Sequence, residues 1–210
     1  AAILGMAGPA MADPDGWYGA VDLGYHWMED FGTNSAANAP DRGPYNFDWS
    51  TEDTWAGFVR LGYRVNPSWR LELEGGYRPG DITSARGFAR TLPTSRALCT
   101  PGVIRTAATP CGSPDGSIDQ WTLMGNVIWD FGPESWAFRP FVGAGGGVSR
   151  VSMDALGQFS TSPTATPANL TIDDSDTVFA WQVLAGFAWA LSDRMSLDFT
   201  ARHLETTELQ

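Results

Sequence analysis

The sequence predicts an all-β protein, an antiparallel up-and-down β-barrel of the eight-stranded type with its apolar side outward. Three observations indicate it: segments that alternate apolar and polar residues, apolar faces without charged residues, and connections that alternate in length. In the first segment the apolar face runs from Trp17 to Trp27, and Asp22 lies on the opposite face. Charges gathered on one face and aromatic rings ending the other favour a barrel surrounded by lipid.

Seven segments follow this alternation and are predicted as strands over residues 16–27, 54–65, 68–78, 118–131, 137–149, 178–191 and 194–204. Short turns are predicted at residues 66–67, 132–136 and 192–193, and long Pro/Ser/Asn/Asp/Gly-rich loops at 28–53, 79–117 and 150–177. In an antiparallel meander, this alternation of short and long connections puts all the long loops at one end. Outer-membrane barrels have short periplasmic turns and long extracellular loops, so the N-terminus is expected to be periplasmic.

Composition excludes some classes and leaves others open. The net charge of −11 argues against nucleic acid as a partner. No run approaches the roughly 20 apolar residues of a membrane-spanning helix, and the mean hydropathy is −0.18. Both facts also fit a membrane barrel, because its strands are only half apolar.

Aromatic residues mark both ends of the predicted membrane-crossing stretch. Trp17 and Trp27 lie 10 residues apart on one face. At ~3.3 Å per residue and a tilt of ~40° they span about 25 Å, the height of an outer-membrane apolar band. The predicted aromatic belts consist of Trp17, Trp27, Trp55, Trp69, Tyr77, Trp121, Phe131 and Trp189.

The polar faces carry charges of both signs, which predicts a network inside the barrel. The interior of an eight-stranded barrel is just wide enough for side chains to fill. The favoured interpretation is a plug of ion pairs, and the alternative is a gated ion path in which the pairs switch partners. Glycines of the fifth segment, such as Gly143 and Gly145, are expected to leave room for long side chains that arrive from opposite strands. The candidate lumenal residues are Asp22, Arg60, Arg64, Arg70, Glu72, Glu74, Arg78, Asp130, Arg139, Arg194, Asp198 and Arg202.

The first residues resemble the end of a secretory leader. An apolar run is followed by Ala10-Met11-Ala12, a small-x-small cleavage site. We therefore expect residues 1–12 to be the remnant of a signal peptide and residues 13–210 to form the barrel domain. The alternative, a short apolar strand, is disfavoured because the run holds few β-branched residues.

Export bears on the two cysteines, Cys99 and Cys111. Eleven residues lie between them in a Pro/Gly/Thr-rich stretch. An oxidising compartment makes a local disulfide the natural inference. By the chain-entropy model it would contribute about 3 kcal/mol.

Short stretches of several predicted strands form an ordered set. They are Gly16-Trp17-Tyr18-Gly19-Ala20, Leu23-Gly24-Tyr25, Arg60-Leu61-Gly62-Tyr63-Arg64, Leu71-Glu72-Leu73-Glu74-Gly75-Gly76-Tyr77, Pro140-Phe141-Val142-Gly143-Ala144-Gly145, Leu197-Asp198 and Arg202-His203-Leu204. Together, over roughly residues 16–204, they resemble the N-terminal transmembrane domain of outer membrane protein A and its relatives.

The resemblance has two further implications. Such barrels have an even number of strands, so we expect the eighth strand to be absent from this sequence, which reaches Gln210 with seven. Relatives often carry a periplasmic peptidoglycan-binding domain after the barrel. Peptidoglycan is therefore an expected partner only through a C-terminal domain that this sequence does not contain.

Weaker patterns suggest other sites. His26 and Asp22 share a lumenal face but stand about 13 Å apart, and no Ser-His-Asp or metal-ligand spacing is found. We therefore expect neither an enzyme nor a cofactor. His203 falls near the outer rim as a belt residue. The cluster Asp173, Asp174 and Asp176 could bind Ca²⁺, although a solvated loop is the favoured interpretation.

Basic residues gather in the second long loop, at Arg86, Arg90, Arg96 and Arg105. They could contact lipopolysaccharide phosphates through charge-assisted hydrogen bonds. The expected partners are thus outer-membrane lipid and lipopolysaccharide.

We therefore expect a non-enzymatic outer-membrane barrel of a Gram-negative envelope, with an anchoring role and at most weak porin-like ion permeation. Two alternatives stay open. A soluble lipocalin-like barrel would hold an apolar ligand, with Leu61 inside and Arg60 in water. A surface adhesin would act through its extracellular loops.

Overall fold

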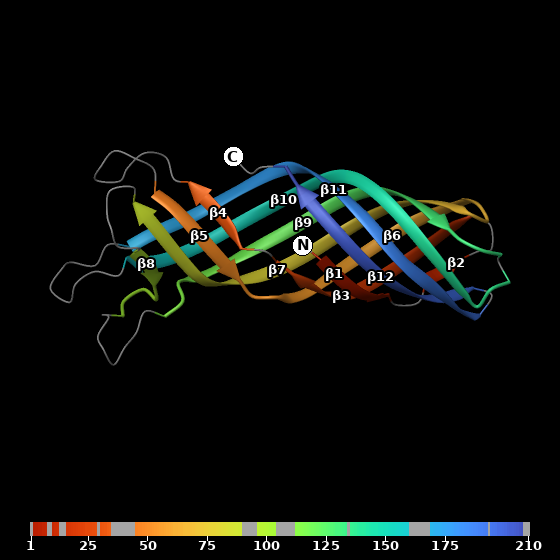
Figure 1. Ribbon diagram of the computed structural model, residues 1–210, viewed down its shortest axis with the longest axis horizontal. Coiled ribbons are helices and arrows are strands. Elements are labelled where there is room, and N and C mark those ends of the chain that lie inside the picture. Colours follow the sequence, from red (N-terminus) through yellow and green to blue (C-terminus); the bar gives the residue numbers. More distant parts are fainter. Residues whose placement is uncertain are drawn as a thin grey trace.

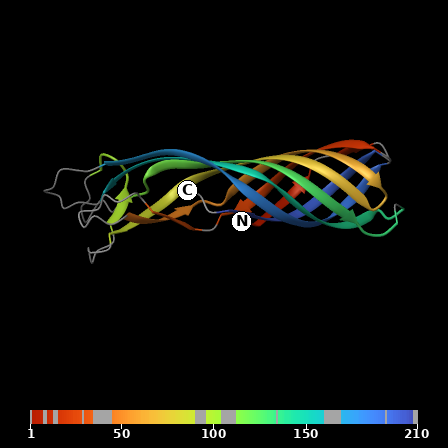
Figure 2. The same ribbon diagram turned by 90° about the horizontal axis from the view of Figure 1, so that it is seen from above.

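The structure is an elongated barrel of β-strands. The computed structural model describes residues 2–7, 10–12, 16–28, 30–34, 45–89, 96–103, 112–133, 135–159, 169–192 and 194–207. Every regular element within these ranges is a strand, and the strands run obliquely along the long axis (Figures 1 and 2). The predicted all-β, antiparallel fold class is confirmed.

Seven long strands pair antiparallel in chain order and correspond to the seven predicted segments. They are β3 (Trp17–Trp27), β6 (Thr54–Asn66), β7 (Trp69–Ala89), β9 (Asp115–Asp130), β10 (Phe138–Phe159), β11 (Asn169–Ser192) and β12 (Met195–Thr206). The turn between β6 and β7 is held by Asn66, whose side-chain oxygen accepts the N–H groups of Ser68 and Trp69 at 2.9 and 3.0 Å. Asn favours turns for this reason.

Residues near the N-terminus complete the ring. β1 (Ala2–Ala7) pairs with β12 on one side and with β3 on the other, and β2 (Ala10–Ala12) adds pairings to both strands. Among the described residues the cycle β3–β6–β7–β9–β10–β11–β12–β1 has eight strands, each with two neighbours. The expectation that the eighth position is missing is therefore wrong.

Backbone pairing explains why the apolar N-terminal segment occupies this position. Without it, β12 and β3 would each present an unpaired edge, which costs several kcal/mol per unsatisfied group in hydrocarbon. Cleavage after Ala12 would remove this segment, and a chain starting at Asp13 would need another strand in its place. The signal peptide stays a prediction.

Side chains on the long strands alternate between an apolar exterior and a polar interior. Leu61 and Leu73 are 51% and 52% exposed, whereas Arg60 and Arg202 are 3% and 2% exposed. A lipocalin-like barrel requires the opposite orientation, so that alternative is wrong.

Aromatic rings contact one another at both ends of the apolar exterior. Tyr77 lies between Trp121 and Trp55, with ring centroids 4.4 and 5.8 Å away, and at the other end Trp69 stacks on Trp129 at 6.0 Å. Of the predicted belt residues, Trp17, Trp27, Trp55, Trp69, Trp121 and Trp189 are exposed, and Tyr77 and Phe131 are partly exposed. The rings thus gather at two levels, as predicted from their spacing.

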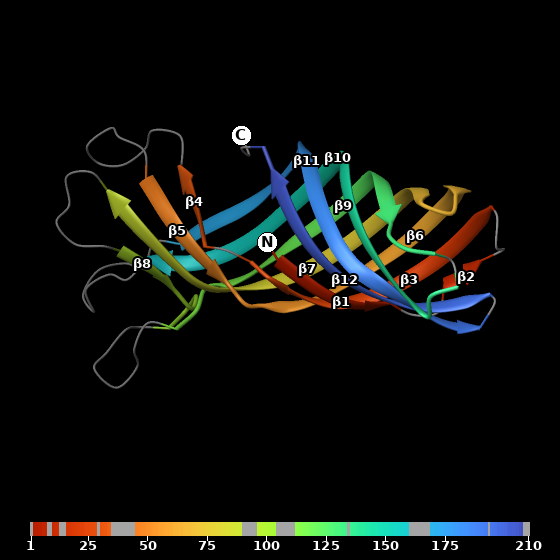
Figure 3. The same ribbon diagram turned by 45° about the vertical axis from the view of Figure 1, so that its right-hand side comes forward.

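Three strands continue far beyond the predicted ends. The third and fifth predicted strands end at residues 78 and 149, but β7 runs to Ala89 and β10 runs to Phe159. The sixth predicted strand begins at residue 178, but β11 begins at Asn169. At 24 residues, β11 is about 80 Å long. The extension of β7 pairs with β5 (Tyr45–Thr51) and β8 (Arg96–Cys99), and the end of β10 also pairs with β8. The outer strand β4 (Phe31–Asn34) pairs with β5. We call these three strands and the adjoining ends of β7, β10 and β11 the distal sheet (Figure 3).

The distal sheet has a core of its own, which is why these segments are strands and not loops. Phe47, Trp49, Ile82, Ala85, Leu98 and Ala155 form a buried apolar cluster, with Met153, Leu170 and Ile172 packed against it. Trp49 is 0% exposed. Burial of this cluster supplies the hydrophobic stabilisation that the extended strands need.

Candidate functional site

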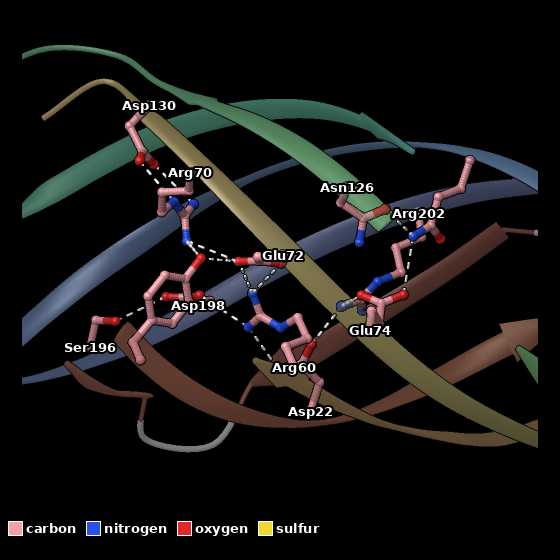
Figure 4. Close-up of polar contacts among 12 residues, drawn as sticks. Asp22, Arg60, Arg70, Glu72, Glu74, Asn126, Asp130, Ser196, Asp198 and Arg202 are labelled. Carbon is pink, nitrogen blue, oxygen red and sulfur yellow. Dashed lines mark hydrogen bonds and ion pairs between the residues drawn. The ribbon is translucent and has the colours of Figure 1, made fainter. Parts of the chain in front are cut away.

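The candidate site is the network of charged side chains inside the barrel (Figure 4). Nine of the twelve predicted lumenal residues are buried: Asp22, Arg60, Arg70, Glu72, Glu74, Arg78, Asp130, Asp198 and Arg202. They come from β3, β6, β7, β9 and β12. Alternation on each strand turns them inward, and the ring brings them together.

Arg60 is the centre of the network. Its Nη2 donates to Asp22 at 2.9 Å and to Asp198 at 3.1 Å, and its Nη1 donates to Glu72 at 3.1 Å. These contacts join β6 to β3, β12 and β7. One cation thus contacts three buried carboxylates from three other strands.

Arg70 extends the network towards the short turns. Its Nε and Nη2 donate to the two oxygens of Asp130 at 2.8 and 2.9 Å, a bidentate pair. Its Nη1 donates to Glu72 at 3.3 Å. The Tyr18 hydroxyl also donates to Glu72. Glu72 thereby links Arg70 to Arg60.

Arg202 extends the network in the opposite direction. Its Nη2 donates to Asp22 and, at 3.1 Å, to Glu74. The second oxygen of Glu74 accepts from Gln182 at 3.1 Å, and Gln182 also donates to Asn126 at 2.8 Å. Carboxylates and amides from five strands are therefore tied into one set of contacts (Figure 4).

The remaining three predicted residues lie outside this buried network. Arg194 is exposed in the turn before β12, and Arg64 and Arg139 are only partly buried. Arg139 donates to the Pro67 carbonyl. All three stand near the short turns, where solvent reaches the strand ends. The lumenal placement of Arg194 was wrong, because its side chain is exposed, and that of Arg64 and Arg139 stays a prediction.

This arrangement has a closed antiparallel ring, an apolar exterior between two aromatic levels, and paired charges inside. The family model for the outer membrane protein β-barrel domain matches residues 1–210. The chain belongs to this family. It is thus an outer-membrane β-barrel, as the resemblance implied.

Relatives of this outer-membrane barrel match it over most of its length. Uncharacterized proteins of Brucella abortus (strain 2308), Brucella suis biovar 1 and Brucella melitensis biotype 1 are each 27% identical over 205 residues. The matches cover 93% of this chain and 69% of each relative. Among the described residues there is no helix of the length and apolarity that crossing a membrane requires.

Two aromatic side chains inside the outer-membrane barrel were overlooked. Tyr18 and Phe58 are 5% and 2% exposed. The guanidinium carbons of Arg202 and Arg78 lie 4.2 and 4.9 Å from the Phe58 ring centroid, within cation–π range. Strand alternation could have located them, because Tyr18 shares a face of its strand with Asp22 and Phe58 shares a face with Arg60.

The lumenal glycines make room for neighbouring side chains. A Cβ at Gly143 would meet Leu184 at 2.5 Å, and a Cβ at Gly145 would overlap Asn126. A Cβ at Gly62 would overlap the Tyr18 ring. Gly143 and Gly145 thus leave room inside, but the side chains that take it come from the adjacent strands β11 and β9 and not from opposite strands.

The weaker candidate sites are placed as follows. His26 is buried, with its Nε2 3.2 Å from the Pro79 carbonyl, whereas Asp22 binds arginines. His203 lies outward beside Trp181, with centroids 6.3 Å apart. Among the described residues no group of three His, Cys, Asp or Glu could hold a metal.

The candidate loop sites fall partly outside the described residues. Asp173, Asp174 and Asp176 lie on β11 and not in a loop. Cys99 is buried at the end of β8, but Cys111 lies outside the described residues, so their disulfide stays a prediction. The structure exposes Arg86 on β7 and places Arg96 at the start of β8, while Arg90 and Arg105 lie outside the described residues.

Proposed function

We propose that this outer-membrane barrel has a structural, envelope-anchoring role and at most weak ion permeation, without enzymatic activity. The filled lumen carries the proposal. Charges around Arg60 are paired across strands, and the apolar cluster of the distal sheet follows towards the long-loop end. An ion on the axis has to separate desolvated ion pairs and then pass apolar side chains, both of which oppose conduction.

The proposed orientation puts the short turns in the periplasm and the distal sheet outside the cell. It is supported by the position of β4, β5 and β8 at the end opposite the short turns (Figure 1). Lipopolysaccharide is the proposed outer partner, with the exposed Arg86 as one contact. A peptidoglycan contact would depend on a domain beyond this sequence.

Planar-bilayer recordings test the proposed lack of a pore. The purified full chain is expected to insert without a steady open state and to show at most brief, small openings. A trimeric porin in the same bilayers is the positive control. A stable conductance after every insertion would contradict the filled lumen and would favour a porin.

A second candidate function, surface attachment, is favoured by the distal sheet. Strands that continue beyond the aromatic level on a core of their own, with Trp49 fully buried, would support the segments that the sequence predicts as loops. Such positioning suits contacts made by loops.

Complementation separates the two functions. In a strain that lacks the gene, a variant with residues 35–44 and 160–168 replaced by short Gly-Ser linkers is expected to restore resistance to detergents as the wild type does. Attachment to a surface is expected to be lost if the loops serve it. If the loop variant fails to restore detergent resistance while still reaching the outer membrane, the anchoring role of the barrel is contradicted.

A further inference from the structure

We propose that the lumen holds a binding site for one small oxyanion, formed by Arg78 with Arg202 beside it. Arg78 lies on β7 with its side chain fully buried. Its Nη1 donates to the Thr122 hydroxyl at 3.0 Å, whereas its Nε and Nη2 have no hydrogen-bond partner. Among the described residues, the other buried lumenal arginines form ion pairs and Arg78 forms none.

Arg70 shows what the vacant edge of Arg78 can bind. The Nε and Nη2 of Arg70 hold the two oxygens of Asp130 at 2.8 and 2.9 Å. The same pair of nitrogens is unpartnered on Arg78. This fork matches two oxygens of a planar anion, the geometry that Arg recognises best.

Other unpartnered donors come from the side chains around this fork. Arg202 and Arg78 both lie against the ring of Phe58, and the Nε and Nη1 of Arg202 have no partner. The unsatisfied groups of both arginines are donors, so an acceptor is the complementary ligand.

The carboxylates nearest to Arg78 are engaged by other residues. Glu74 precedes Arg78 on the same face of β7, but its oxygens are taken by Arg202 and Gln182. Asp22 is taken by Arg60 and Arg202. A guanidinium buried without a counter-charge is costly, and an anion bound at its fork removes much of that cost.

The surroundings restrict the size of the ligand. Thr122 and Phe58 fill the space over Gly76, where a Cβ would meet them at 2.5 and 2.9 Å. The class of ligand that matches this fork is therefore a small planar monovalent oxyanion such as nitrate or formate. The site is distinct from the proposed anchoring function and does not depend on it.

Side-chain NMR tests the site, with nitrate as the probe. The full chain, labelled with nitrogen-15, is folded into detergent micelles in mixtures of sodium nitrate and sodium gluconate at constant total salt. Folding in the presence of nitrate removes any dependence on access to the lumen, and gluconate is too long to be buried there. The Nε–H resonances of Arg78 and Arg202 are expected to shift saturably with nitrate. Those of Arg70, already bound to Asp130, and of the exposed Arg150 are expected to stay unchanged.

Matched variants complete the test. Arg78→Gln is expected to abolish the nitrate-dependent shift at Arg202, and Arg150→Gln is expected to leave it intact. If Arg78→Gln does not migrate as a folded barrel in unheated gels, the wild-type comparison of Arg78 with Arg70 decides. An Arg78 resonance that is identical in nitrate and gluconate, or that shifts in parallel with Arg150, would overturn the proposal.

Discussion

Replacing Arg60 by methionine is expected to lower the free energy of unfolding by about 3–5 kcal/mol. The variant keeps a long apolar side chain but removes the cation that Asp22, Glu72 and Asp198 share at 2.9–3.1 Å. Buried carboxylates that lose a cation keep the free-energy cost of desolvation without the compensating ion pair. Asp198 loses its ion pair with Arg60. Urea unfolding in detergent micelles, followed by tryptophan fluorescence, measures the loss as a lower midpoint at unchanged slope.

Arg194 provides the matched control for this substitution. It is exposed in the turn before β12, so Arg194→Met is expected to change stability by less than about 0.5 kcal/mol. Equal effects of the two substitutions would show that the buried network does not stabilise the barrel.

Replacing Trp49 by alanine is expected to destabilise the distal sheet by about 3–5 kcal/mol and to leave the rest of the barrel intact. Trp49 is fully buried in the apolar cluster and stacks near Phe47, with centroids 5.8 Å apart. Since 1.4 kcal/mol corresponds to a factor of ten, amide exchange in β5 and in the outer end of β7 should accelerate by roughly 10²-fold or more. Hydrogen exchange followed by mass spectrometry resolves these segments.

Trp55 is the control for the distal sheet. It lies six residues further along the chain, but it faces outward and is 50% exposed. Trp55→Ala should leave exchange in β5 unchanged. If Trp49→Ala accelerates exchange in β6 and β12 as much as in β5, the distal sheet is not a separate unit of stability.

Alternation alone predicted most of the barrel. The parity of Trp17 against Asp22, repeated on each strand, located the exterior and the interior, because a strand turns successive side chains to opposite faces. The same rule assigned Arg60, Glu72 and Arg202 to the lumen, where they are buried. It could not specify partners, since register and ring closure decide which carboxylate meets which guanidinium.

Features that depend on non-local packing were beyond the sequence pattern. The extended ends of β7, β10 and β11 looked like loops because residues 79–117 and 150–177 are rich in Pro, Ser, Asn, Asp and Gly. The cluster around Trp49 forms only when five segments meet. Arg194 follows the same alternation as Asp198 and Arg202, but it lies in the turn before β12 and its side chain is exposed to solvent. The N-terminal apolar segment has too little β propensity to be identified alone, and its place in the ring follows from two unpaired edges.

The contacts of Arg60 and Arg202 have a consequence for assembly. Arg60 and Asp198 are 138 positions apart, and Arg202 and Asp22 are 180 apart. These pairs exist only after the first and last hairpins have met, so a half-formed sheet would carry bare charges towards the acyl chains. Partial insertion is therefore unfavourable, and the buried charges favour concerted insertion of all strands into the bilayer.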